Sequence, residues 1–312
     1  MKIAFIFSGQ GSQYVGMGKE LCDGFECAKE VFTQADEALN LSISEICFED
    51  SRGLINQTEY TQPAVLTTSI AALKVLEEKG IKADFMAGLS LGEYSACVGA
   101  GMMEFTDALK LVRKRGRFMS EAVPEGEGSM YAIMGLDRAI VENACSEVMS
   151  EKGYVAPANY NAPGQIVIAG KAAAVEDTAV MLKEAGAKMT VKLNVSGPFH
   201  TKLLQPAAIK LEEELKRISI KESRTPVVTN VYAKPYESVE EVIPTLVKQV
   251  MSPVEWENTL RYLYAEGVDT FIEIGPGKAL SGFVKRTLKG VKILNVEDMK
   301  SLEKTLSALE EF

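Results

Sequence analysis

Short apolar segments alternate with longer helical patterns in this chain, and no other feature limits its possible folds so strongly. The runs Ile3–Phe7 and Phe85–Leu89 read as buried strands, and apolar periodicity predicts helices within 17–39 and 62–79 and a helix from Leu91. Buried strands separated by helices are typical of a parallel sheet covered on both faces. The sequence therefore predicts an α/β fold with a mostly parallel sheet.

A different order begins after the charged, glycine-rich break at 124–128. The predicted elements are strand 130–134, helix 139–149, strand 155–160, turn 161–164, strand 165–169, helix 173–185 and strand 189–193. This β-α-β-β-α-β order is the split βαβ unit of ferredoxin-like proteins. We expect residues 126–197 to form a small inserted subdomain, and residues 1–125 and 198–312 to form the large one.

The composition excludes several classes of protein. A chain of 312 residues with 46% hydrophobic content can bury a large core. Its apolar runs are too short for a membrane span, and the first is too short for a signal peptide. The five cysteines lack metal or redox spacing, and the net charge of −9 disfavours nucleic acid as a partner. We expect a cytoplasmic protein that binds neither nucleic acid nor membrane.

The run Gly88-Leu89-Ser90-Leu91-Gly92 lies where a predicted strand meets a predicted helix. In that context a G-x-S-x-G sequence indicates a nucleophile elbow, in which the glycines permit a sharp turn that exposes the serine hydroxyl. The alternative is a serine that only caps the helix. We favour Ser90 as a nucleophile, on a core that resembles the α/β-hydrolases.

A serine nucleophile needs a base and donors for the oxyanion that forms. The only histidine in the sequence, His200, follows a glycine-proline loop where the insert ends, so it is the only candidate imidazole. The amide of Leu91 is one natural oxyanion donor. The loop Gly9–Gln13 after the first strand could supply another, although an ordinary strand-to-helix turn is the simpler interpretation of that loop alone.

A buried cation near the nucleophile would select an acyl group that bears a carboxylate. Arg113, Arg115 and Arg117 lie on the helix after the elbow helix, where a solvated basic face is the simpler interpretation. The sequence pattern alone does not choose among them.

Several separated motifs together resemble the malonyl-CoA:acyl carrier protein transacylases. The resemblance covers essentially the whole chain, in order. The motifs are Gly9–Gln13, Thr61–Val65, Gly88–Glu93, Arg115-Gly116, Asn161–Gln165, Pro198–His200, Gln249 with Ser252–Val254, and Glu273–Gly277.

The resemblance implies a role for each matching residue. Ser90 would carry the malonyl group as an ester, and His200 would move the proton. The amides of Gln10 and Leu91 would bind the oxyanion, and the backbone carbonyl of Gln249 would orient His200. Arg115 would grip the malonyl carboxylate with its planar fork. Gln165 would line the pocket, and Phe199 would favour malonyl over α-methylated units.

One departure from the family pattern precedes the nucleophile. The family commonly has histidine there, and this chain has Leu89. That histidine is not the base in the family mechanism, so we expect activity to survive. The departure leaves open the polar contact behind the elbow and the stability of the acyl-enzyme.

The resemblance also implies partners. Malonyl-CoA would be the donor and an acidic acyl carrier protein the acceptor, with no cofactor or metal. We predict that the carrier protein docks near Lys188, Lys285 and Arg286, because surface charge steers encounter even between proteins of like net charge.

Three other functions share part of this sequence pattern. A thioesterase of the same elbow architecture would use water as acceptor, but it normally carries an acidic residue before its histidine. A polyketide acyltransferase would serve another pathway with the same chemistry. A non-enzymatic carrier-binding subunit would have lost Ser90, His200 or Arg115, and the sequence keeps all three.

Overall fold

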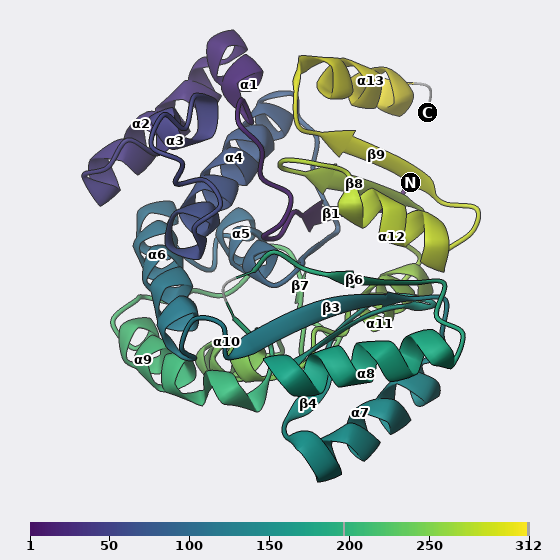
Figure 1. Cartoon of the computed structure of the whole chain (residues 1–312). Coiled ribbons are helices and arrows are strands. Elements are labelled where there is room, and N and C mark those ends of the chain that lie inside the picture. Colours follow the sequence, from purple (N-terminus) through teal and green to yellow (C-terminus); the bar gives the residue numbers. More distant parts are fainter. Residues whose placement is uncertain (196, 311–312) are drawn as a thin grey trace.

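Two sheets organise the molecule, one parallel and one antiparallel (Figure 1). The computed structural model describes residues 1–195 and 197–310. The parallel sheet comes from the two ends of the chain and the antiparallel sheet from the segment between them. This agrees with the predicted α/β class.

The parallel sheet has the strand order β7-β2-β1-β8-β9. Its strands are β1 (Ile3–Phe7), β2 (Phe85–Gly88), β7 (Val227–Val228), β8 (Thr270–Ile274) and β9 (Lys292–Val296). Every neighbouring pair is parallel, so the carboxyl ends of all five strands lie along one edge. Loops that follow these strands therefore meet at that edge, where ligands bind in open α/β sheets.

Helices cover both faces of the parallel sheet, and every residue of β1, β2, β7 and β8 is buried. On one face Ala4, Ile6 and Phe271 pack against α11 (Trp256–Ala265) and α12 (Ala279–Thr287). The opposite face, which includes Phe5 and Phe7, belongs to the larger core cluster. Helices of that cluster are α1 (Lys19–Gly24), α2 (Glu26–Leu39), α3 (Ile43–Phe48), α4 (Thr58–Glu78), α5 (Leu91–Gly99), α6 (Phe105–Glu121), α9 (Gln205–Leu215), α10 (Val242–Met251) and α13 (Met299–Glu310).

The antiparallel sheet has the order β4-β5-β3-β6. Its strands are β3 (Gly128–Met134), β4 (Val155–Ala162), β5 (Gln165–Lys171) and β6 (Met189–Lys192). One face packs against α7 (Arg138–Lys152) and α8 (Ala172–Glu184) through Ile133, Ile166 and Ile168. The other face contributes Met130, Ala132 and Val167 to the larger core cluster. The second sheet thus presents one face to the rest of the molecule.

The element boundaries differ from the sequence-based expectations in a few places. The sequence pattern does not predict the short helix α3, because six residues are too few to show a clear period. Helix α4 begins four residues before the expected position, at Thr58. Strand β4 continues to Ala162, so Pro163 and Gly164 alone form the turn before β5.

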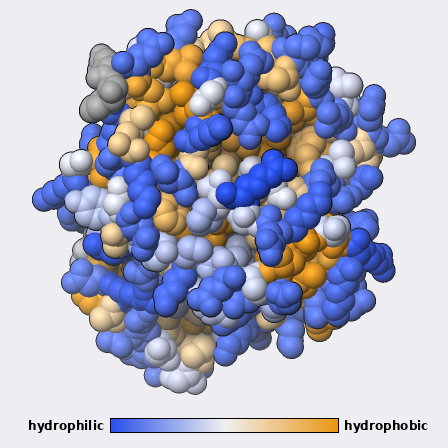
Figure 2. All heavy atoms as spheres, turned by 180° about the vertical axis from the view of Figure 1, so that it is seen from behind, coloured by the Kyte–Doolittle hydropathy of each residue, from blue (hydrophilic) through white to orange (hydrophobic). Residues whose placement is uncertain are grey.

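The molecular surface is largely polar on the face shown in Figure 2, with scattered apolar side chains. Within residues 1–195 and 197–310, no helix is long and apolar enough to cross a membrane.

Candidate active site

Ser90 lies in the sharp turn between β2 and α5. Its backbone angles are φ 52° and ψ −99°, a strained conformation with positive φ that residues other than glycine rarely adopt. Gly92 allows the turn, because a Cβ there would overlap the carbonyl of Phe7. The geometry is that of the nucleophile elbow expected from the G-x-S-x-G run.

His200 lies beside Ser90. Its Nε2 is 2.7 Å from Ser90 Oγ, and its Nδ1 is 2.9 Å from the backbone carbonyl of Gln249 on α10. A carbonyl only accepts hydrogen bonds, so Nδ1 carries the proton and Nε2 is free to accept the serine proton. Burial, followed by the charge of Arg115, lowers the pKa of His200 to about 4. The imidazole is therefore a neutral base near pH 7.

Arg115 reaches the same point from α6. Its side chain is 1% exposed, and its Nη2 donates to Ser90 Oγ at 3.1 Å and to Gln249 Oε1 at 3.0 Å. Nη1 donates to Gln62 Oε1 at 2.8 Å. Among the described residues no carboxylate forms an ion pair with this guanidinium, whose partners are neutral oxygens. A guanidinium with this set of partners is able to bind an anion beside the Ser90 hydroxyl.

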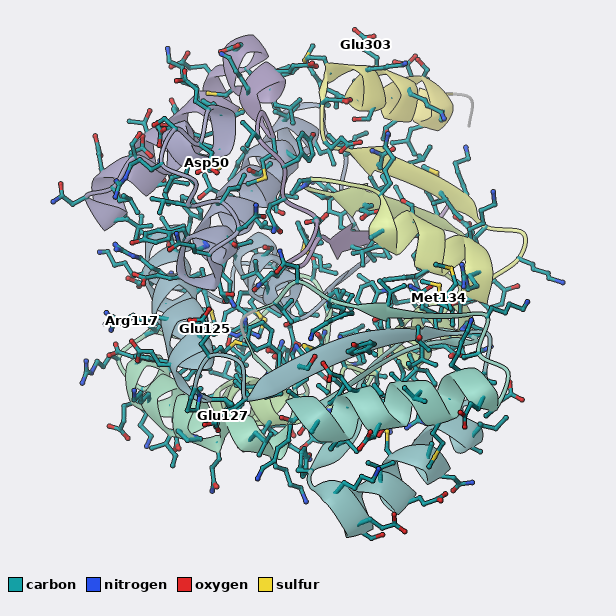
Figure 3. The ribbon with its side chains drawn as sticks, in the orientation of Figure 1. Asp50, Arg117, Glu125, Glu127, Met134 and Glu303 are labelled. Atoms are coloured by element: carbon teal, nitrogen blue, oxygen red, sulfur yellow. The ribbon has the colours of Figure 1, made fainter. Side chains whose placement is uncertain are left out.

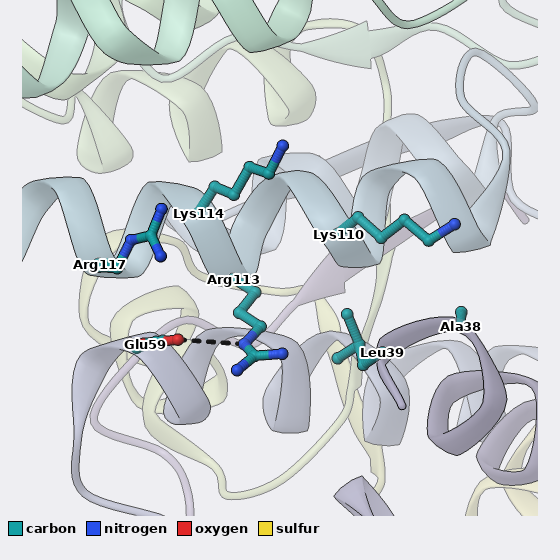
Figure 4. Close-up of a pocket in the computed structure, with 7 residues that line it drawn as sticks. All are labelled: Ala38, Leu39, Glu59, Lys110, Arg113, Lys114 and Arg117. Carbon is teal, nitrogen blue, oxygen red and sulfur yellow. Dashed lines mark hydrogen bonds and ion pairs between the residues drawn. The ribbon is translucent and has the colours of Figure 1, made fainter. Parts of the chain in front are cut away.

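The other two arginines of α6 lie on its opposite side. Arg113 forms an ion pair with Glu59 at 3.1 Å (Figure 4), and Arg117 points outward from the helix (Figure 3). Together with Lys110 and Lys114 they line a basic surface pocket. The structure thus leaves Arg115 as the arginine of this trio that contacts Ser90.

The two backbone N–H groups predicted as oxyanion donors lie just after β1 and β2. Leu91 is the first residue of α5, so its N–H has no partner in the helix. Gln10 lies in the loop after β1, which neighbours β2 in the sheet. The two loops are in contact, since a Cβ at Gly9 would overlap the carbonyl of Leu89. Neither N–H donates to a protein acceptor in the part of the chain that the structure describes.

The remaining predicted site residues are Phe199, Gln165 and Leu89. Phe199 is buried next to His200. Gln165 begins β5 and alternates with Ile166, so it lies on the same face of that sheet as Val167, away from α7 and α8. Among the described residues it makes no hydrogen bond to Ser90, His200 or Arg115. The side chain of Leu89 packs against the apolar cluster below the elbow.

Sequence reasoning gave no role to three polar side chains that complete the site. Gln62 holds Arg115, and Asn230 accepts the Ser90 N–H at 2.6 Å. Glu93 is fully buried and accepts from Gln249 Nε2 at 2.8 Å; burial raises the pKa of its carboxyl group. Gln62 and Glu93 lie inside motifs already noted, but Asn230 had only one signal, a polar side chain just after a strand.

The predicted docking residues Lys188, Lys285 and Arg286 are all exposed. In the part of the chain that the structure covers, no group of three or more histidine, cysteine or acidic side chains is placed to hold a metal ion.

Comparison with known proteins gives a consistent result. Residues 4–305 match the family described as the acyl transferase domain. The malonyl CoA-acyl carrier protein transacylase of Bacillus subtilis (strain 168) is 48% identical over 310 residues, 99% of this chain and 98% of the relative.

Solved structures extend the comparison to the fold. The transacylase of the same name from Clostridium perfringens superposes with a TM-score of 0.97 at 51% identity, covering 100% of this chain and 98% of the other. A malonyl-transacylase in complex with its type II PKS acyl-carrier protein gives a TM-score of 0.96 at 41% identity, covering 99% and 100%.

Proposed function

The chain belongs to the acyl transferase domain family, and from this premise we propose that it is an acyl carrier protein S-malonyltransferase. It transfers malonyl from malonyl-CoA to the phosphopantetheine thiol of an acyl carrier protein, through an ester on Ser90. The observation that carries this proposal is that His200 Nε2 and Arg115 Nη2 lie 2.7 Å and 3.1 Å from the hydroxyl oxygen of Ser90.

The first half-reaction forms the acyl-enzyme. His200 Nε2 takes the proton of the Ser90 hydroxyl while Oγ bonds to the thioester carbon. The negative charge moves to the carbonyl oxygen, which the N–H groups of Leu91 and Gln10 stabilise. The carbon–sulfur bond then breaks, and the coenzyme A thiolate takes the proton from Nε2.

The second half-reaction reverses this sequence with a different thiol. His200 takes the proton of the carrier's phosphopantetheine thiol, whose sulfur attacks the ester carbon. Ser90 leaves and regains a proton from Nε2. The chain supplies the nucleophile, the base and the oxyanion donors, so the proposed reaction requires no resident cofactor. Malonyl-CoA and coenzyme A are its substrate and product.

Arg115 sets the preference for malonyl in this proposal. Two nitrogens of its planar fork can bind the two oxygens of a carboxylate in parallel. Acetyl groups lack that carboxylate and gain nothing from the arginine. Phe199, beside the base, and Gln165, on the inward face of the second sheet, are proposed to shape the remaining pocket.

We propose that the carrier protein docks where β6 meets the end of β3. Lys188, Lys285 and Arg286 would attract its acidic surface, and Met189 and Val191 are 51% and 38% exposed on the adjacent strand. Met134, which pairs with Met189, marks this end of the sheet on the same side of the molecule as α12 (Figure 3). Exposed apolar side chains next to a lysine suit an acidic helix with an apolar face.

Reversing the three charges tests this surface. The triple change to glutamate should raise the KM for the carrier protein at low salt and leave the KM for malonyl-CoA unchanged. The same reversal at Lys110, Arg113 and Lys114, in the basic pocket of Figure 4, is the control. An effect of the control alone would place the carrier on that pocket instead.

We also propose an assignment of the two subdomains to known fold types. The strand order β4-β5-β3-β6 with two helices on one face supports a ferredoxin-like subdomain at 126–197. The elbow at the carboxyl end of β2 supports an α/β-hydrolase-like large subdomain at 1–125 and 198–312. Five unpaired cysteines support the expected cytoplasmic location.

Malonyl transfer for fatty acid synthesis is the reading we favour, and polyketide synthesis is the second candidate. The structural relative solved with a type II PKS carrier favours the second. A thioesterase is disfavoured because His200 Nδ1 faces the carbonyl of Gln249 and not a carboxylate.

Thiol release from malonyl-CoA separates transfer from hydrolysis. With malonyl-CoA alone, the enzyme should release about one equivalent of coenzyme A and then stop. Adding carrier protein should restore continuous release. Continuous release without any carrier would identify a hydrolase and overturn the proposal.

A further inference from the structure

The side chain of Asn230 forms hydrogen bonds with the backbone on both sides of Leu89, in the strained turn that carries Ser90. Its Oδ1 accepts the Ser90 N–H at 2.6 Å, and its Nδ2 donates to the Gly88 carbonyl at 2.7 Å. One planar amide therefore clamps the peptide groups that flank Leu89. Neither group takes part in the α5 ladder, so this clamp satisfies polar groups that would otherwise be buried without partners.

The position of Asn230 follows from the sheet. Strands β2 and β7 are parallel neighbours, with Met86 opposite Val227 and Ala87 opposite Val228. Continuing that register by two residues places Asn230 level with Leu89, between the two groups that it binds. The short strand β7 thus delivers an amide side chain to the base of the elbow.

Asn230 is itself fixed on all sides. It is fully buried, its N–H donates to Glu93 Oε2 at 3.1 Å, and its carbonyl accepts from the Glu255 N–H at 2.8 Å. Glu93 lies one turn into α5 and also holds Gln249, whose carbonyl orients His200. The clamp is therefore tied to the base as well as to the nucleophile.

We propose that Asn230 is a positioning residue that holds the Ser90 backbone in its strained conformation, with Oγ facing His200 and the Leu91 N–H facing the oxyanion. It acts through Ser90 and does not touch the substrate. Both contacts require a side chain that accepts one hydrogen bond and donates another. Asn230→Leu therefore removes both hydrogen bonds, and Asn230→Asp, with an ionised carboxylate, keeps only the one from the Ser90 N–H. This role rests on Ser90 being the nucleophile of the proposed function.

The test compares wild type, Asn230→Leu and Asn230→Asp in rapid acylation by malonyl-CoA and in labelling by a fluorophosphonate. The neighbouring variant Thr229→Val is the control, since it removes a buried hydroxyl that bonds to the Tyr232 N–H and not to the elbow. We expect Asn230→Leu to slow acylation and labelling about 10- to 100-fold with the KM for malonyl-CoA nearly unchanged. Asn230→Asp should lose less, and Thr229→Val should match wild type.

Wild-type rates in Asn230→Leu, or an equal loss in Thr229→Val, would overturn the proposal. If Asn230→Leu does not fold, Asn230→Asp decides, because slower acylation at unchanged KM supports the clamp and a wild-type rate refutes it. Failure of wild type to react with malonyl-CoA would instead refute the proposed function. Fluorophosphonate labelling would still compare the variants in that case.

Discussion

Replacing Arg115 by alanine would measure what the buried guanidinium contributes to substrate choice. Its Nη1 and Nη2 now donate only to neutral oxygens, so a bound carboxylate would receive two charge-assisted hydrogen bonds. A hydrogen bond to a charged group contributes about 1.5–3 kcal/mol, or about 3–6 kcal/mol for two. At about 1.4 kcal/mol per tenfold, kcat/KM for malonyl-CoA should fall about 10²- to 10⁴-fold.

The assay compares malonyl-CoA with acetyl-CoA. Alanine also leaves Gln62 Oε1 and Gln249 Oε1 without their donor, which disturbs the site for both substrates. The ratio of the two kcat/KM values cancels that shared loss and reports the carboxylate contact alone. Arg117→Ala is the matched control on the outer side of α6 (Figure 3). A malonyl-to-acetyl ratio that is unchanged in Arg115→Ala would refute the assignment.

Three further predictions follow from the same geometry. Because burial lowers the pKa of His200 to about 4, the imidazole stays neutral down to that pH. The kcat/KM for acylation of Ser90 should therefore be flat from pH 6 to 8 and fall only as the pH drops towards 4. A midpoint near 6.5 in the pH profile would contradict the burial argument. Gln62→Ala removes the acceptor that aims Nη1 of Arg115, so malonyl transfer should fall about tenfold, a loss of about 1.4 kcal/mol, with acetyl transfer little changed in the same assay. Gly92→Ala places a methyl group against the Phe7 carbonyl and should lower the free energy of unfolding by about 1–3 kcal/mol in a thermal unfolding experiment. An unchanged Tm would show that the turn accommodates a methyl group at this position.

The sequence contained enough local information to place the elbow and most of the elements around it. Strand, turn and helix signals around Ser90 are contiguous, and a parallel sheet brings its loops to one edge regardless of detail. The helical period separates Arg115 from the other two arginines, but the sequence pattern alone does not show which side of the helix is buried. Arg113 and Arg117 are four residues apart and share a face, while Arg115 lies on the opposite side of α6.

The contacts behind the elbow could not be predicted in this way. Asn230 follows Ser90 by 140 residues, and its contact depends on β7 pairing with β2, which no local pattern specifies. Glu93 lies in the first turn of α5, where an acidic side chain is common and usually exposed. Its burial follows only from the packing of α10 and of the loop after β7 against that helix. Long-range pairing, and not local propensity, makes this part of the site.

Mass spectrometry of the intact protein, followed by peptide mapping, tests the covalent intermediate most directly. After incubation with malonyl-CoA, wild type should gain the mass of one malonyl group on the peptide that contains Ser90, and Ser90→Ala should gain none. Adding holo acyl carrier protein should remove the adduct from the enzyme and place it on the carrier. An adduct on another residue, or an adduct that persists in Ser90→Ala, would contradict the account.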